Sequence, residues 1–176
     1  VTGSIEERGG YCLPKGFGFK HPDPQPPAPK VKSELAHPRE YPLAEHKVSH
    51  HVAQMIKEGR QKVSVYIRHY YNGCYSNPDA DTWKEVYLDE KLIPFHVSMD
   101  TFMSETTALS DLILPETTFL ERFDIENMPS SIETPWVGIR QPVVKPLGEC
   151  KSYRDIVLEL VTKYLDPAGS LGIKKY

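Results

Sequence analysis

The chain has 176 residues, enough for one domain with a sizeable core, and its 39% hydrophobic and 26% charged residues are ordinary for a soluble protein. A net charge of −3 offers no basic surface, and no apolar run is long enough to span a membrane, so we expect neither nucleic-acid partners nor direct membrane insertion. Three widely spaced cysteines form no zinc or iron–sulfur pattern, and we expect free thiols at Cys12, Cys74 and Cys150.

The first 45 residues are predicted to be an irregular, proline-rich arm. The stretch HPDPQPPAPK, residues 21–30, lacks backbone donors at its prolines and favours an extended form. A loop of this length is unusual inside a compact domain, and the first residues, VTGSIEERGG, show neither an initiator Met nor a signal-peptide core. We therefore expect a fragment of a longer protein, with an α/β domain over residues 46–165 and a tail over 166–176.

From residue 46 onward, apolar periodicity predicts alternating helices and strands. Helical spacing indicates helices over 46–59, 79–90, 104–111 and 153–164. Apolar and β-branched runs indicate strands over 62–68, 93–98 and 111–114, with one more possible within 136–144. Ser152 and Asp155 form a near capping box at the start of the last helix. Strands joined by single helices must be parallel, which predicts an open, doubly wound, mostly parallel sheet.

In such sheets, ligands bind beyond the carboxyl ends of the strands. The loops after the three predicted strands should therefore converge at one edge. The polar and aromatic candidates that they bring there are Tyr71, Asn72, Ser76, Asn77, Pro78, Ser98, Asp100 and Ser104.

Asp100 raises the main chemical question, because it ends an apolar run and is followed by hydroxyl side chains. The chain has neither a GxGxxG after the first strand nor a P-loop, which argues against the common phosphate cradles. A carboxylate can accept two parallel N–H bonds, and guanine offers such a pair at its ring N–H and exocyclic amine. The Ser104 hydroxyl and the start of the short helix could bind a phosphate or sugar oxygen. The alternative is that Asp100 only caps the next helix or turn.

The stretch DTFMSETTALSDLILPETTFLER, residues 100–122, resembles the molybdopterin oxidoreductase (DMSO reductase) family. Members carry a D-x-F-x-[ST]-x-T-x-x-[AS]-D motif followed by an apolar strand ending in LP and then by Glu. The turn at Asn77 and Pro78 and the segment PLGECKSYRDIVLELV, residues 146–161, also match in position. The resemblance covers residues 46–165.

The resemblance implies a molybdenum or tungsten centre held by two molybdopterin guanine dinucleotides, with this region binding the guanosine end of one. It implies that Asp100 bonds the guanine edge and that Ser76, Asn77, Pro78 and Ser104 line the pocket. Catalytic subunits of the family are several times longer. A 4Fe-4S cluster, the metal ligand and the barrel that grips the pterins would lie outside this chain, which alone should be inactive and holds no catalytic residue.

Within the family, ETPWVGIRQPVVKPLGE, residues 133–149, looks most like large subunits of thiosulfate, polysulfide, tetrathionate and arsenate reductases. Partners would be the remaining domains of the same polypeptide, a membrane-anchor subunit, and an iron–sulfur electron-transfer subunit. The location would be periplasmic or membrane-associated in a prokaryote. Two alternatives stay open: a cofactor-less structural subunit of the same fold in a respiratory complex, and a free-standing nucleotide-binding module.

Overall fold

The computed structural model describes residues 7, 8, 10, 51–128 and 136–170, so the predicted arm lies almost wholly outside the described residues. They fall into two compact units. The sheet unit comprises described residues 51–116 and 149–155, and the hairpin unit comprises 7, 8, 10, 117–128, 136–148 and 156–170. Within these ranges, no helix has the length and apolarity needed to cross a membrane. The predicted extent of the α/β domain stays a prediction.

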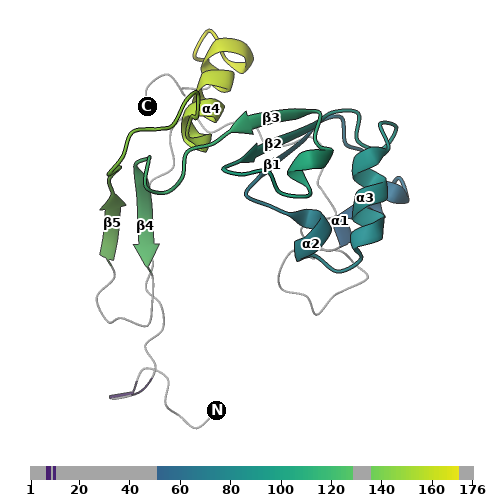
Figure 1. Ribbon diagram of the computed structural model, residues 1–176, viewed down its shortest axis with the longest axis horizontal. Helices are drawn as coiled ribbons and strands as arrows, with labels where there is room; N and C mark the ends of the chain where they lie inside the picture. The colour runs from purple at the N-terminus through teal and green to yellow at the C-terminus, as the bar shows by residue number, and fades with distance from the viewer. Residues whose placement is uncertain (1–6, 9, 11–50, 129–135, 171–176) are drawn as a thin grey trace. The chain divides into compact units, whose positions relative to one another are not determined.

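Three parallel strands form the sheet of the sheet unit (Figure 1). They are β1 (Tyr66–His69), β2 (His96–Asp100) and β3 (Leu112–Pro115), and β2 lies in the centre. Every residue of β2 is buried, as expected for a strand with neighbours on both sides. The prediction of three adjacent parallel strands is confirmed, whereas the doubly wound arrangement stays a prediction.

The first two strands begin later than predicted, at 66 rather than 62 and at 96 rather than 93. The apolar residues that open each run do not extend the sheet. Val63, Leu92 and Ile93 instead pack on the hydrophobic cluster beside it. A turn places the last two there, because both their N–H groups donate to the carbonyl of Asp89, at 2.9 and 3.0 Å.

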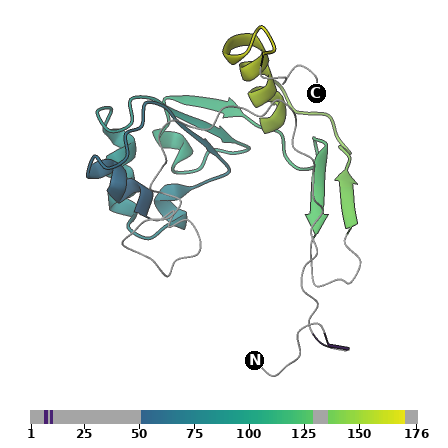
Figure 2. The ribbon, with the colours of Figure 1, turned by 180° about the vertical axis from the view of Figure 1, so that it is seen from behind.

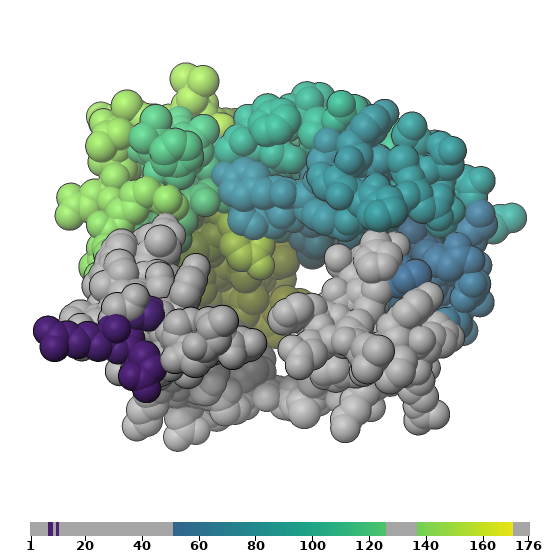
Figure 3. Space-filling model, turned by 90° about the horizontal axis from the view of Figure 1, so that it is seen from below, coloured from purple at the N-terminus to yellow at the C-terminus, as the bar shows by residue number. Residues whose placement is uncertain are grey.

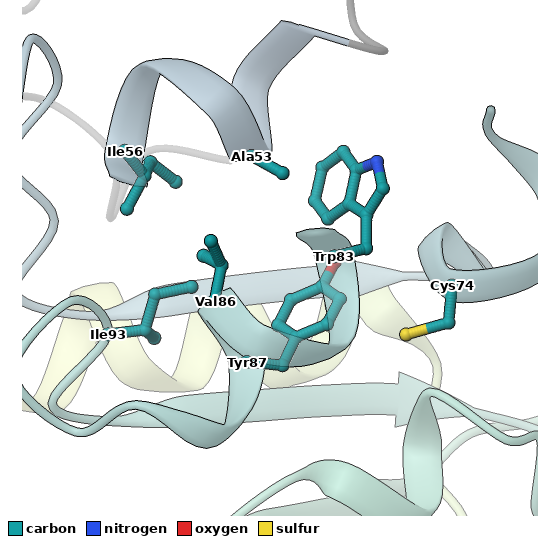
Figure 4. Close-up of a cluster of buried hydrophobic side chains, with 7 residues drawn as sticks. All are labelled: Ala53, Ile56, Cys74, Trp83, Val86, Tyr87 and Ile93. Atoms are coloured by element: carbon teal, nitrogen blue, oxygen red, sulfur yellow. The ribbon is translucent and has the colours of Figure 1, made fainter. Parts of the chain in front are cut away.

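Helices α1 (Val52–Lys57) and α3 (Ala80–Leu88) supply most of that cluster, which is drawn in Figure 4. Trp83, Val86 and Tyr87 come from one face of α3 and meet Ala53 and Ile56 of α1. The space-filling view shows the blue-to-green residues of the unit packed against one another (Figure 3). Both helices lie within the predicted ranges, and Trp83 is buried between them.

A short helix after β1 was missed by the sequence analysis, which predicted only a loop there. Helix α2 (Gly73–Ser76) forms because the carbonyl of Asn72 accepts the N–H groups of Tyr75 and Ser76, at 3.0 and 2.8 Å. Gly73 permits this turn to lie close to the aromatic cluster. A Cβ added at Gly73 would meet the Tyr87 hydroxyl at 2.9 Å and the Tyr71 ring at 3.0 Å.

The predicted short helix at 104–111 is reduced to a 3₁₀ turn, η3 (Thr107–Leu109), which leads into β3. After β3, a later segment returns to the sheet unit. The N–H of Lys151 donates to the carbonyl of Pro115 at 3.2 Å, and Lys151 pairs with Glu116 in a parallel bridge. Ser152 and Asp155 then bond each other reciprocally, at 2.7 and 3.2 Å, at the start of α4 (Tyr153–Leu160). The predicted cap is confirmed.

The hairpin unit contains an antiparallel pair, β4 (Asp124–Met128) and β5 (Trp136–Arg140), which Figure 2 shows from behind. The possible strand at 136–144 is confirmed in its first half, and β4 was missed. Asp124 bonds Arg140 at 2.7 Å and Arg122 at 3.3 Å, so these charged side chains lie together where β4 begins and β5 ends. The predicted last helix ends early, because α4 changes into a π-helical turn, η4 (Val161–Leu165).

We expect Gly73→Ala to lower the free energy of unfolding by about 1–3 kcal/mol, because the added methyl overpacks the buried contact with Tyr71 and Tyr87. Urea denaturation of the two proteins measures this difference. Gly59→Ala is the matched control. Nothing lies within 4 Å of a Cβ there, and its cost of about 1 kcal/mol would come from the positive φ of +71° alone. A Gly73→Ala protein as stable as the wild type would contradict the described packing.

His96, in the centre of the sheet, is a buried histidine that must stay neutral. Its ring stacks on Tyr87 at 4.5 Å between centroids and meets Tyr66 edge-on at 5.6 Å. Within the described residues, its Nδ1 is buried with no hydrogen-bond partner. Burial and the nearby Arg68 lower the pKa of His96 from 6.5 to about 4. Protonation therefore favours the unfolded chain, in which the imidazole has its ordinary pKa.

Stability should fall as the pH is lowered through the window from 6.5 to about 4, since the unfolded state binds the extra proton there. The loss from this group reaches about 3 kcal/mol at pH 4. The check is the free energy of unfolding at several pH values for the wild type and His96→Phe, which keeps the stacking. The variant should lose less stability over this window, and identical pH slopes would contradict the assignment.

Candidate functional site

The loops that follow the three strands converge at the carboxyl edge of the sheet, as predicted. The Tyr70 N–H donates to the Met99 carbonyl at 3.2 Å, and the Glu116 N–H donates to the Asp100 carbonyl at 3.0 Å. These bonds tie the end of β1 to β2 and the end of β2 to the residue after β3. The edge therefore collects side chains from three separate stretches of sequence, as ligand sites in parallel sheets do.

Asp100 closes β2 and forms a buried ion pair with Arg68 of β1. Arg68 Nη1 lies 3.2 Å from Asp100 Oδ2, and only 1% and 5% of the two side chains are exposed. Isolated charges at such a depth would be costly, so each group supplies the compensation that the other needs. Arg68 Nη1 also donates to the carbonyl of Tyr71 at 2.6 Å, which fixes the first turn of the loop after β1.

Two hydroxyl side chains extend the network around this pair, although Arg68 Nε is buried with no hydrogen-bond partner among the described residues. Thr107 donates to Asp100 Oδ2 at 3.2 Å, and Thr107 Oγ1 accepts from Arg68 Nη2. Since that hydroxyl proton is used, Ser104 donates to Thr107 Oγ1 at 2.7 Å. Ser104 Oγ in turn accepts from Arg68 Nη2 at 3.5 Å and from the Thr107 N–H at 3.2 Å. The structure thus places Ser104 inside the protein, bonded to its neighbours.

The hydrogen bonds of this network occupy three acceptor positions of the Asp100 carboxylate. A carboxylate offers about four acceptor positions, two on each oxygen. Oδ2 uses both, with Arg68 and Thr107. Oδ1 accepts from the backbone N–H of Thr101 at 2.9 Å. Among the described residues, one acceptor position on Oδ1 therefore has no hydrogen-bond partner, whereas a double reading of guanine would require a free position on each oxygen.

Asn72 joins the loop after β1 to the loop after β2. Its Oδ1 accepts from Thr106 Oγ1 at 2.6 Å and from Thr106 N–H at 3.3 Å, and its Nδ2 donates to Glu105 at 2.7 Å. Thr106 Oγ1 also accepts from the Cys74 N–H at 3.1 Å, at the start of α2. The amide of Asn72 is therefore a structural clamp between two of the predicted site loops.

The other predicted residues divide into those at the edge and those below it. Asn77 Nδ2 donates to the Tyr71 hydroxyl, so both half-buried side chains lie together after β1. Ser76 and Pro78 are exposed beside them. Ser98 is fully buried in β2 and bonds Ser110, which places it within the sheet and away from the edge.

A second pair of polar side chains at this edge, Glu116 and His69, was not predicted. Glu116 is fully buried, with Oε2 at 2.7 Å from His69 Nε2 and Oε1 accepting from the Tyr153 N–H at 3.2 Å. The His69 ring stacks on Tyr153 at 4.5 Å and lies against Tyr70 at 4.2 Å. Tyr70 has a positive φ of 49°, which is unusual for a residue with a side chain. Glu116 therefore holds a histidine between two tyrosines where β1 ends.

Arg68 was also missed, because an arginine inside an apolar strand is ordinarily taken as a solvent-facing residue. The strand in fact exposes Ile67 and buries Arg68. One signal was available, since a carboxylate that ends a largely apolar run is costly to bury and is often paired with a cation. An arginine on the neighbouring predicted strand is the natural candidate.

The part of the chain that the structure describes brings no three metal-binding side chains together. What it does offer at the sheet edge is a buried carboxylate with an open acceptor position, amide and hydroxyl groups, and exposed aromatic rings. This set of groups suits a purine base and a ribose better than a metal ion.

Comparison with known proteins supplies the wider context. The family model for molybdopterin oxidoreductase matches residues 33–163. A sulfite dehydrogenase subunit from Allochromatium vinosum is 42% identical over 90 residues, which cover 48% of this chain and 9% of that protein. The thiosulfate reductase molybdopterin-containing subunit PhsA of Salmonella typhimurium is 44% identical over 64 residues, which cover 36% of this chain and 8% of that protein.

A tetrathionate reductase subunit from Salmonella typhimurium is 27% identical over 114 residues, covering 60% of this chain and 10% of that protein. The match thus spans about a tenth of each relative's length.

The buried pair can be tested by a double-mutant cycle. We expect Arg68→Met to destabilise the chain by about 3–5 kcal/mol, because it leaves the Asp100 carboxylate buried without its cation. Adding Asp100→Leu should recover part of that loss, with a coupling of about 0.5–3 kcal/mol in urea denaturation. Lys57 and Glu85 are the control pair, since both are largely exposed and their removal should change stability little. Strictly additive effects at Arg68 and Asp100 would contradict the pairing.

Proposed function

Since the chain belongs to the molybdopterin oxidoreductase family, we propose that it binds the guanosine end of one molybdopterin guanine dinucleotide within the catalytic subunit of a molybdenum-dependent oxidoreductase. The observation that carries this proposal is the carboxyl edge of the sheet. Three loops meet there around Asp100, an ionised, buried carboxylate that keeps one open acceptor position. A neutral N–H of a base is a suitable donor for such a position.

The residues of this chain would hold the cofactor rather than react with it. Asp100 accepts a base N–H, and the half-buried Tyr71 and Asn77 form one wall of the same edge. Ser76 and Pro78 lie exposed beside them. Asn72 fixes the distance between the loops through Thr106 and Glu105. Ser104 and Ser98 support the site from within.

The bound cofactor would supply two-electron chemistry at its metal, coupled to transfer of an oxygen or sulfur atom. The chain contributes orientation, through the rigid strand ends, and exclusion of water around the base. Its own side chains therefore perform no catalytic step.

For the intact protein we propose a sulfur compound or a related oxyanion as substrate, because relatives are named for sulfite, thiosulfate and tetrathionate. Its partners would be a membrane-anchor subunit plus an iron–sulfur electron-transfer subunit. A 4Fe-4S cluster would lie in another part of the same polypeptide, and the complex would be periplasmic or membrane-associated. The bis form of the cofactor, with molybdenum or tungsten, belongs to the same proposal.

The decisive measurement is the guanine nucleotide and molybdenum content of the whole protein that carries this chain, for the wild type and Asp100→Asn. The single amide oxygen of Asn can face Arg68 and Thr107, or face Thr101 and the base, but not both. Because two buried donors point at the Oδ2 position, the amide oxygen should take that place and the N–H₂ group should face the base. Leaving the base N–H unpaired costs about 1–3 kcal/mol, or roughly 5- to 150-fold in binding. We expect a corresponding loss of both contents.

Asp111→Asn is the matched control for that experiment. Asp111 is also a carboxylate bonded to the sheet, with Oδ2 accepting from the His96 N–H at 2.7 Å, but it lies at the opposite end of the strands. Asn can accept that bond, so cofactor content should stay unchanged. Full cofactor content in Asp100→Asn, or no guanine nucleotide in the wild type, would overturn the proposal. The second result would favour a cofactor-less structural subunit.

A further inference from the structure

Arg68 donates to the Asp100 oxygen, Oδ2, that would otherwise be available to accept a second N–H from a bound base. It donates to Asp100 Oδ2 at 3.2 Å and shares that oxygen with Thr107. We propose that Arg68 is a positioning residue that restricts Asp100 to a single N–H donor and thereby determines which bases the site accepts. This inference rests on the proposed function, because it concerns how the same site reads its base.

The guanidinium and a guanine edge are competing partners for the same carboxylate. Each presents parallel N–H groups in a plane, the arrangement that a carboxylate binds with both oxygens. In this structure one oxygen is already saturated from inside the protein. A base that approaches from solvent therefore finds Oδ1 alone, with one acceptor position left beside the Thr101 N–H.

A ligand would not displace Arg68 from this role. The side chain is 1% exposed, and it is held by the Tyr71 carbonyl at 2.6 Å as well as by Ser104 and Thr107. Releasing Oδ2 would break these bonds together and leave a buried cation unpaired. The geometry of the pair is therefore set before any ligand arrives.

The pair also fixes the charge of the site. Asp100 and Arg68 neutralise each other, so the remaining acceptor favours a neutral donor over a cation. The lactam N–H of a 6-oxopurine meets this requirement. Adenine presents an acceptor nitrogen at that ring position and would oppose acceptor to acceptor, with a penalty typical of unpaired buried groups.

Guanine and hypoxanthine should then bind Asp100 alike, because both carry the lactam N–H and differ only in the exocyclic amine. A site in which both carboxylate oxygens read the base would instead lose at least about fivefold in affinity for hypoxanthine. The ratio of the two affinities therefore reports whether Arg68 withholds Oδ2.

The test uses the whole protein that carries this chain, purified from cells that cannot make the molybdenum cofactor. GMP, IMP and AMP are the probes, and calorimetric titration measures their dissociation constants. For the wild type we expect GMP and IMP to agree within about threefold and AMP to bind at least about tenfold more weakly.

Arg68→Met frees Oδ2, and its preference for GMP over IMP should rise by about fivefold or more. A role in stability alone would lower the melting temperature and leave that ratio unchanged. Thr107→Val, which removes the other donor to Oδ2, should shift the ratio in the same direction and covers the case in which Arg68→Met does not fold. Lys57→Met makes the same chemical change at an exposed ion pair and should alter nothing.

The outcomes separate the two claims. If the wild type binds GMP but rejects IMP by about tenfold, or if neither variant changes the ratio, the role of Arg68 is wrong and the proposed function stands. If the wild type binds none of the three nucleotides, or binds AMP as well as GMP, the proposed function fails and the inference with it.

Discussion

The buried pair of Arg68 and Asp100 is the interaction on which the rest of the site depends. It joins two parallel strands at the edge where they end, and the guanidinium also holds the Tyr71 carbonyl and the hydroxyls of the next loop. Replacing such a pair by apolar side chains is often neutral for stability, so its presence calls for another reason. One such reason is that the pair holds the Asp100 carboxylate in a fixed direction at the end of β2.

The position of the candidate site in the fold was predictable from the sequence, whereas the partners of its side chains were not. The position of Asp100 at a strand end, with Ser104 close behind it, followed from apolar patterning and the geometry of parallel sheets. The partner of Asp100 did not, because pairing across strands depends on which side of a strand faces the core. In β1 that side carries Tyr66 and Arg68, while Ile67 is exposed, and composition alone favours the reverse.

For the fold, the order and direction of the strands were predictable from the sequence, but the exact ends of the strands were not. Parallel strand order follows from the alternation of strands and helices, whereas strand limits do not, because apolar residues at the ends of a run can join a neighbouring cluster. Val63 and Ile93 do so here. Helix α2 was not predicted, because it also depends on contacts that the local sequence pattern does not reveal. Its hydrogen bonds go to the Asn72 carbonyl, and Gly73 lies close to Tyr87, a side chain of the later helix α3.

The bridge between Glu116 and Lys151 has a consequence for how this protein can change. Residues 117–148 leave the sheet unit and the chain returns to it at a point bonded to the place of departure, since Lys151 N–H meets the Pro115 carbonyl and Tyr153 N–H meets Glu116. The entropy of closing such a loop grows only slowly with its length. The segment 117–148 can therefore lengthen, shorten or be exchanged over evolutionary time without moving the carboxyl edge of the sheet, which makes it a natural place for diversification within the family.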